Sequence, residues 1–293
     1  MCSTSFDRMA FIWNHRVDEF DDRRMNSYSN YAVLQGHKNA VLDCTWCDET
    51  TIATCSADKT IMVWDATTGQ RQRKLTEHTS IVNAIDSSSS SSGTTTLISV
   101  SDDKACLVWD IRTKRPVQRL EQAYPALAVA VAGTDHQVFV SGIDPKIYCW
   151  DMRRSEHAVY SMKGHTDTVT SLALHPETTH VLSNSMDRTL RTWDIRPFVG
   201  GKSKKRHTHT FTGHAHASER GLLKCAWSAD GNLVSAGSSD HRVHIWDVLS
   251  QEELYDLPGH TACVNAVTFH PVETTVVASG ASDQCIYVGE LSS

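Results

Sequence analysis

The sequence predicts an all-β chain that folds as a seven-bladed β-propeller, with its first blade incomplete at the amino terminus. A small residue, any residue and an Asp recur along the 293 residues, and a Trp stands six positions after most of these Asp residues. A Gly-His pair precedes most of the copies. The runs between these markers have strand character, and none shows sustained helical periodicity.

The Asp-to-Trp repeat is the strongest of these observations. Successive Asp residues stand 41 to 53 positions apart, as from Asp103 to Asp144 and from Asp187 to Asp240. A propeller blade of four strands repeats about every 40–45 residues. The six pairs are Asp7 with Trp13, Asp58 with Trp64, Asp103 with Trp109, Asp144 with Trp150, Asp187 with Trp193 and Asp240 with Trp246, and in a seventh copy Asp283 precedes Gly289.

The repeats predict one domain, residues 1–293, made of seven blades. Short runs such as Ala40–Trp46, Thr51–Cys55 and Thr60–Trp64 are predicted to be successive strands of one blade. A lone four-stranded sheet leaves both of its faces uncovered, whereas radial stacking of several sheets covers them. The expected blades are approximately 1–27 (partial), 28–72, 73–117, 118–157, 158–205, 206–251 and 252–293.

Each blade is expected to contain a buried polar network. A His in the loop that enters the blade, the Asp of a tight turn, a strand Ser or Thr and the Trp indole N–H have the donors and acceptors for a chain of hydrogen bonds. Such a chain is stabilising only when every member is satisfied. The expected members are His37, Asp58, Trp64, His78, Asp103, Trp109, Asp144, Trp150, His165, Asp187, Trp193, His214, Asp240, Trp246, His260 and Asp283.

The order of Gly-His, Asp and Trp-Asp along the whole chain resembles the WD40 repeat family. This resemblance implies a platform that binds other proteins and has no catalytic activity. The irregular repeats resemble, more narrowly, the WD-repeat subunits of the spliceosomal U5 small nuclear ribonucleoprotein. The segments that carry the narrower resemblance are Gln122–Val129, Ser141–Asp144, Leu182–Asp187, Trp193–Phe198, Leu222–Ser228 and Tyr287–Leu291.

The narrower resemblance implies a nuclear scaffold that acts in pre-mRNA splicing. Its implied partners are the large proteins of the particle, including the scaffold at the catalytic centre and the RNA helicase. The formal net charge of −6 argues against a surface built to neutralise phosphates, so RNA contact is expected to be at most local and indirect. The alternative is a generic WD40 adaptor, such as a ubiquitin-ligase substrate receptor, which typically carries an additional helical segment.

Three turn residues are candidates for partner binding. The residue before the repeated Asp is Ala, Ser or Asp in most copies, as a solvated turn prefers, but it is Phe6, Ile143 or Met186 in three copies. Such a large apolar side chain either contacts a partner or packs against a neighbouring loop, and the sequence leaves both interpretations open. The resemblance favours partner contact, because these three residues are typical of the U5 subunits.

No catalytic, cofactor-binding or metal-binding residue is predicted, and neither is a small-molecule substrate. Nearly half of the obvious His–Asp pairs are accounted for by the repeat, and no convergent titratable groups are left over for an enzyme. Cys44 and Cys47 have metal or redox spacing but point to opposite faces of a predicted strand. A closely spaced His tract is assigned to a loop and a blade entrance rather than to a metal: His207, His209, His214 and His216.

Two further segments and the cysteines bear on the surface and the compartment of the protein. Gly200–Arg206, with its basic part Lys202–Arg206, is either a solvated loop or a segment for nuclear import or RNA phosphate contact. Ser87–Ser92 is expected to be a flexible surface insert. The nine scattered cysteines indicate thiols in a reducing compartment, and no apolar run approaches the roughly 20 residues of a membrane span.

The two ends of the chain are expected to leave the propeller incompletely closed. Only six residues precede Asp7, whereas Asp58 follows its blade-entry His by 21 positions. The first blade therefore lacks a blade-entry His and an innermost strand, and the last blade stops at Ser293 soon after its third strand. We expect either that the polypeptide begins upstream of Met1 or that a strand from a partner covers the last blade.

Overall fold

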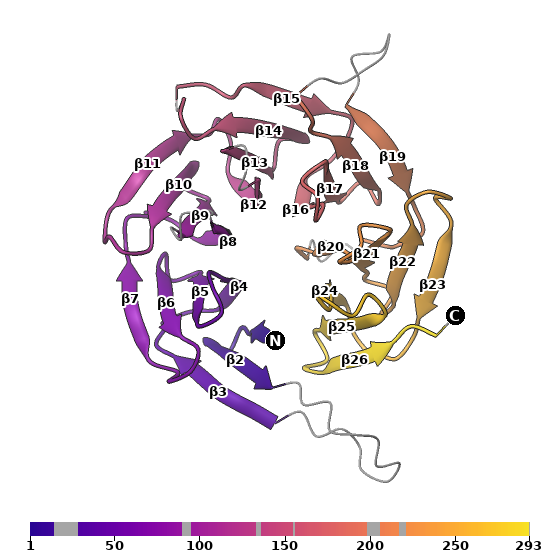
Figure 1. Cartoon of the computed structure of the whole chain (residues 1–293), viewed down its shortest axis with the longest axis horizontal. Helices are drawn as coiled ribbons and strands as arrows, with labels where there is room; N and C mark the ends of the chain where they lie inside the picture. Colours follow the sequence, from indigo (N-terminus) through magenta and orange to yellow (C-terminus); the bar gives the residue numbers. More distant parts are fainter. Residues whose placement is uncertain are drawn as a thin grey trace. The chain divides into compact units, whose positions relative to one another are not determined.

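The computed structural model describes residues 1–14, 29–89, 95–132, 136–154, 156–197, 206–216 and 221–292, and the regular elements in these ranges are all β-strands. The strands form seven sheets in chain order (Figure 1). The predicted all-β, seven-bladed β-propeller class with an incomplete first blade is confirmed. Among the described residues, no helix is long and apolar enough to cross a membrane. The chain contains two compact units, Met1–Ala126 and Leu127–Ser293.

Three sheets make up the first unit. The first sheet contains β1 (Cys2–Thr4), β2 (Met9–Asn14) and β3 (Ser29–Gln35). The second contains β4 (Val41–Trp46), β5 (Thr51–Ser56), β6 (Ile61–Asp65) and β7 (Arg71–Leu75). The third contains β8 (Val82–Ser89), β9 (Thr95–Ser101), β10 (Ala105–Asp110) and β11 (Pro116–Glu121). Strand β4 lies beside β1, and β8 lies beside β4 and β5.

Four sheets make up the second unit. The fourth and fifth sheets contain β12 (Ala126–Ala132), β13 (Gln137–Gly142), β14 (Lys146–Asp151) and β15 (Tyr160–Lys163), and β16 (Val169–Leu174), β17 (His180–Ser185), β18 (Leu190–Asp194) and β19 (His207–Phe211), respectively. The sixth sheet contains β20 (Cys225–Trp227), β21 (Leu233–Gly237), β22 (Val243–Asp247) and β23 (Glu253–Leu257). The seventh sheet contains β24 (Val264–Phe269), β25 (Val276–Ala281) and β26 (Ile286–Glu290). Strand β16 lies beside β13, β20 beside β16, and β24 beside β20.

Burial along the strands follows their place in the sheet. Every residue of β5 is buried, and four of the five residues of β6 are buried. A short run that is buried on both faces need not alternate polar and apolar residues. β5 is accordingly made of apolar and small hydroxyl residues, and the four buried residues of β6 are apolar. The outermost strand β7 has the sequence RQRKL, of which only Leu75 is buried. Charged residues therefore mark the outer edge of the sheet.

The repeated Trp residues pack towards the preceding sheet of their unit. Trp64 lies in the apolar cluster that joins the first and second sheets, and Trp109 lies in the cluster that joins the second and third. In the second unit, Trp193 and Trp246 occupy the corresponding places. All four side chains are at most 2% exposed. Burial of such large rings supplies much of the packing energy between sheets.

The turn that holds the repeated Asp has a common backbone conformation. The residue after the Asp has a positive φ angle in six sheets: Arg8, Lys59, Lys104, Arg188, His241 and Gln284. In the second sheet, the Thr60 N–H donates to Asp58 Oδ1 at 3.0 Å, so the Asp side chain satisfies the turn. The fourth sheet has Pro145 at this place. A proline ring fixes φ near −65°, so this turn adopts a different conformation.

The predicted blade limits separate outer strands from their sheets. Strands β3, β15, β19 and β23 belong to the preceding sheet, although the predicted limits place them at the start of 28–72, 158–205, 206–251 and 252–293. The limits at 72/73 and 117/118 fall inside β7 and β11. The reason is local pairing: each outer strand pairs antiparallel with the third strand of the preceding sheet, as where Arg71 pairs with Trp64.

The serine tract is partly strand, contrary to expectation. Ser87 to Ser89 continue β8 and pair with Leu97, Thr96 and Thr95. The Ser87 hydroxyl donates to the Trp46 carbonyl oxygen at 2.7 Å, which fixes this part of the tract against the second sheet. The rest of Ser87–Ser92, from residue 90, lies outside the described residues, as does the basic run 200–206 apart from Arg206.

Candidate protein-interaction site

The repeated His and Asp residues form a hydrogen-bonded network in four of the described sheets. In the second sheet, His37 Nδ1 lies 3.0 Å from Asp58 Oδ2, and His37 Nε2 lies 2.9 Å from the Thr54 hydroxyl. The Trp64 indole N–H donates to the same hydroxyl at 2.8 Å. The other three networks contain His78, Ser99, Asp103 and Trp109; His165, Ser183, Asp187 and Trp193; and His260, Ser279 and Asp283.

One direction of hydrogen bonding satisfies every member of a network. The indole N–H donates to the hydroxyl oxygen, the hydroxyl donates to the imidazole Nε2, and the Nδ1–H donates to the carboxylate. Burial lowers the pKa of His165 despite the opposing effect of Asp187, which keeps the imidazole neutral. Burial alone would raise the pKa of Asp187, but the hydrogen bonds from His165 and Thr189 outweigh it and lower this pKa well below its usual range.

The fourth sheet does not contain the predicted network. Val140 stands ten positions before Trp150, at the place that a hydroxyl residue occupies in the second, third and fifth sheets. The Trp150 indole nitrogen is consequently buried without a hydrogen-bond partner. Asp144 is also in a different arrangement, because it accepts hydrogen bonds from Lys146 at 3.1 Å and from the Tyr148 hydroxyl at 2.6 Å. The prediction that Asp144 and Trp150 belong to one network is wrong.

The prediction that His214, Asp240 and Trp246 form such a network in the sixth sheet is also wrong. Ala236 replaces the hydroxyl residue there, so no side chain joins the imidazole to the indole. His214 Nε2 instead lies 2.9 Å from the Asn184 side-chain oxygen of the fifth sheet, and the Trp246 indole N–H donates to a backbone carbonyl oxygen. Asp240 is bonded to Nε2 of a different histidine, His244, at 2.9 Å.

A strand Ser or Thr was expected in each network without its position being named, and the role of His244 was not predicted. Thr54, Ser99, Ser183 and Ser279 each stand four positions before the repeated Asp, so the spacing of the repeat itself indicates them. His244, Glu253 and Asp256 come together only because β22 and β23 form a hairpin, in which His244 pairs with Asp256. Recognising that cluster requires the strand register as well as the residue types.

The Cys pair and the His tract, whose spacing is typical of metal ligands, lie in strands or are buried near them. Cys44 packs against the apolar cluster between the first and second sheets, whereas Cys47 lies in the cluster between the second and third. The two thiols therefore lie on opposite faces of their sheet. His207 and His209 are in β19, and His214 and His216 are buried before β20.

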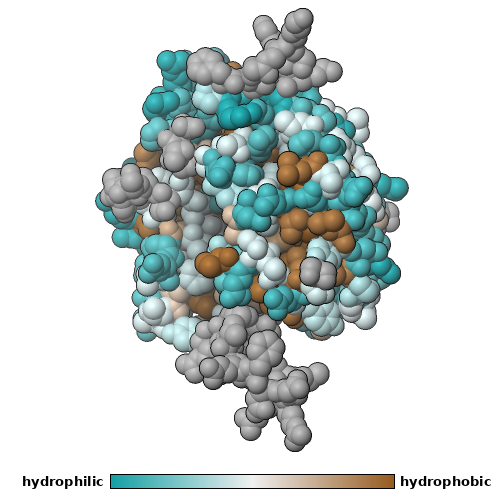
Figure 2. All heavy atoms as spheres, turned by 45° about the vertical axis from the view of Figure 1, so that its right-hand side comes forward, coloured by the Kyte–Doolittle hydropathy of each residue, from teal (hydrophilic) through white to brown (hydrophobic). Residues whose placement is uncertain are grey.

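Two of the three candidate partner-binding residues are exposed. Phe6 is 78% exposed in the first unit, and Ile143 is 52% exposed in the second. Met186, at the same turn position in the fifth sheet, is half-buried. In the view of Figure 2, apolar areas lie among mostly hydrophilic side chains. Because their side chains are exposed, Phe6 and Ile143 have apolar surface that a partner can cover.

Comparison with known families identifies the repeat. The family model described as WD domain, G-beta repeat matches residues 28–65, 69–110, 157–194, 205–247 and 251–288. The chain belongs to the WD40 repeat family. Strands β12 to β14 of the fourth sheet lie between the second and third matched stretches. In this sheet Val140 stands at the place of the network hydroxyl, and Pro145 stands at the turn position after the Asp.

Three relatives share most of this WD40 chain. It is 40% identical to the pre-mRNA-splicing factor cwf17 of Schizosaccharomyces pombe, over 99% of this chain and 81% of the relative. It is 36% identical to the U5 small nuclear ribonucleoprotein 40 kDa protein of Dictyostelium discoideum, over 99% of this chain and 78% of the relative. The human protein of the same name is 40% identical over 78% of this chain and 62% of the relative.

Proposed function

We propose that this chain is a non-enzymatic protein-interaction scaffold of the U5 small nuclear ribonucleoprotein that acts in pre-mRNA splicing in the nucleus. The observation that carries this proposal is the similarity, over 99% of the chain, to relatives named as a splicing factor and a U5 protein. The geometry supports it, because the recurring His–Asp pairs are used in buried structural networks.

The proposed partners are the large proteins of the particle, including the scaffold at its catalytic centre and the RNA helicase. Phe6, Ile143 and Met186 are the proposed contact residues, since they occupy equivalent turns and two of them are largely exposed. A partner that covers these side chains removes apolar area from water, which is worth about 25 cal/mol per Å². The net charge of −6 supports indirect rather than direct association with RNA.

Identification of co-purifying molecules tests this proposal. The tagged full chain, expressed in its own cells, is expected to recover U5 small nuclear RNA together with large spliceosomal proteins. Recovery of cullin-type ligase subunits without spliceosomal RNA would contradict it and would support the alternative, a WD40 substrate receptor of a ubiquitin ligase.

A triple variant tests the contact residues separately. Replacing Phe6, Ile143 and Met186 by Ser is expected to weaken recovery of the particle while the melting temperature changes little. The matched control replaces three apolar residues that are at least as exposed as Ile143 but lie outside the Asp turns: Val117, Leu249 and Val272, at 69%, 83% and 79% exposure. Loss of recovery in the control alone would place the contact elsewhere, and lost stability in the first variant would favour loop packing.

A further inference from the structure

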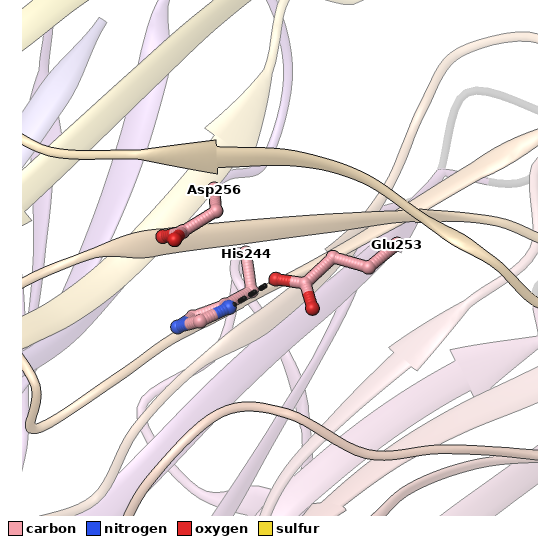
Figure 3. Close-up of side chains that lie close together, drawn as sticks. All are labelled: His244, Glu253 and Asp256. Atoms are coloured by element: carbon pink, nitrogen blue, oxygen red, sulfur yellow. Dashed lines mark hydrogen bonds and ion pairs between the residues drawn. The ribbon is translucent and has the colours of Figure 1, made fainter.

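The sixth sheet brings an imidazole and two carboxylates together on its outer hairpin. His244 lies on β22, and Glu253 and Asp256 lie on β23, so strand pairing fixes their spacing. His244 Nδ1 is 2.5 Å from Glu253 Oε1. One ligand atom from each of the three residues lies within 4.8 Å of the others. In Figure 3 the Glu253 carboxylate is bonded to the imidazole, and the Asp256 carboxylate lies near the ring without a bond to it.

A third carboxylate orients the imidazole from its other side. Asp240 Oδ2 lies 2.9 Å from His244 Nε2, and the His244 side chain is buried. A histidine that binds a metal through one ring nitrogen usually donates the N–H of the other to a carboxylate, which fixes the ring and its tautomer. Asp240 is in that position, so Nδ1 is the nitrogen directed at Glu253.

The charges around His244 favour a cation. Glu253 and Asp240 bond the imidazole, and an Asp256 oxygen lies within 4.8 Å of ligand atoms of His244 and Glu253. Asp256 is also paired with the cationic side chain of Arg242. A neutral imidazole has a single N–H and satisfies only one of its two carboxylate neighbours. The second needs a proton or another cation on the ring.

The residues around His244, Glu253 and Asp256 leave space for these side chains, and the sixth sheet lacks the His–Asp network of the second, third, fifth and seventh sheets. Glu253 lies against the backbone of Gly213, where a Cβ would stand 2.9 Å from Oε2. The next residue, His214, is 3% exposed, and its Nδ1 has no hydrogen-bond partner. In the network sheets that nitrogen bonds the repeated Asp, but here Asp240 is bonded to His244. The His244 cluster thus replaces the network as the polar link between the turn and the outer strands.

We propose that His244, Glu253 and Asp256 form a binding site for a divalent transition-metal ion of the Zn²⁺ type. Imidazole nitrogen and carboxylate oxygen are ordinary zinc ligands, at about 2.0–2.2 Å, and three protein ligands leave a fourth position for water. The ion takes the place of the proton on His244 Nδ1, and that proton is released to solvent. The ion joins β22 to β23, and Asp240 orients the imidazole.

Zn²⁺ titration of the purified, metal-free full chain tests the site. Calorimetry is expected to show one ion bound per chain, a raised melting temperature, and affinity that increases from pH 6 to pH 7.5 because the proton competes for Nδ1. Mg²⁺ at the same concentration is expected to give no shift, because it prefers oxygen ligands. Absence of any Zn²⁺-dependent heat or melting shift would overturn the proposal.

Four variants separate this site from others on the chain. Glu253→Gln and Asp256→Asn are expected to abolish the calorimetric transition, and Asp240→Asn is expected to weaken affinity by about 10–100-fold. Arg242→Gln is expected to strengthen affinity, because it releases Asp256 and removes a positive charge. Melting without metal shows that each variant is folded. Unchanged Zn²⁺ binding in folded Glu253→Gln would assign the ion to other residues and overturn the proposal.

Discussion

In each complete network, one hydroxyl oxygen bonds both the imidazole and the indole. Ser183 lies 2.7 Å from His165 Nε2 and accepts the Trp193 N–H at 2.8 Å. A buried donor or acceptor that loses its partner costs about 1–3 kcal/mol, so the hydroxyl satisfies two groups that are otherwise unpaired. Thr54 and Ser99 act in the same way in their sheets.

Replacing Trp193 by Ala tests the contribution of one network residue. Trp193 is 1% exposed, and truncation of a buried Trp removes both its packing and the indole hydrogen bond. The expected loss is about 3–5 kcal/mol in the free energy of unfolding, measured by urea titration. Trp46→Ala, at a position that is 41% exposed, is the control and is expected to cost much less. Equal losses in the two variants would contradict the network role of Trp193.

At the scale of the element, the sequence predicted the sheets better than their polar contacts. The recurring Asp located the seven sheets, six of them with a Trp six positions later, because the turn and the third strand recur with fixed geometry. The networks of the fourth and sixth sheets were not predictable from the same pattern. In each of these sheets the network is lost because one strand residue outside the pattern, Val140 or Ala236, has no hydroxyl. His214 instead hydrogen-bonds to Asn184 in the neighbouring sheet. The outer strands were misassigned because the pattern does not record pairing.

Supplying the missing hydroxyl in the fourth sheet tests this explanation. Val140→Thr nearly preserves side-chain shape and places a hydroxyl where the network sheets have one, beside the unpaired Trp150 indole. The new hydrogen bond is expected to stabilise the chain by about 0.5–1.5 kcal/mol. Val138→Thr is the matched control, because Val138 is equally buried and pairs with Trp150 on the neighbouring strand.

The control is expected to destabilise the chain, since its hydroxyl has no corresponding unpaired donor to satisfy. Thermal and urea unfolding of both variants measure the difference. A Val140→Thr variant that is destabilised as much as Val138→Thr would show that the indole nitrogen is not accessible to a hydroxyl at residue 140.

At the scale of the whole molecule, net charge determines the expected behaviour towards RNA. The chain carries a formal charge of −6, with 28 Lys and Arg against 34 Asp and Glu residues. Non-specific affinity for nucleic acid arises mainly from neutralised phosphates and falls steeply with salt. The isolated protein is therefore expected to bind random RNA weakly in a filter or anisotropy assay at physiological salt. A tight complex with a steep salt dependence would contradict this expectation.

Stability of the whole molecule is expected to decrease as the pH falls from 7.5 to 5. Burial lowers the pKa of His37, His78 and His165, and it lowers the pKa of His214 to about 3. An unfolded histidine titrates near 6.5, so below that pH the unfolded chain binds more protons than the folded chain. The free energy of unfolding then falls with falling pH.

His244 has the opposite effect on how stability changes with pH, so a His244 variant tests the direction of that change. Because the folded pKa of His244 is raised, its contribution is fully present below about 6.5 and is lost as the pH rises through the folded value. Replacing His244 by Gln removes that opposing contribution, so the melting temperature of the variant is expected to fall more steeply with falling pH than that of the parent chain. Melting curves of both proteins in metal-free buffer, recorded from pH 7.5 to 5, measure the two slopes. A parent melting temperature that rises on acidification, or a variant with the shallower slope, would contradict the lowered pKa of the buried blade histidines and the raised pKa of His244.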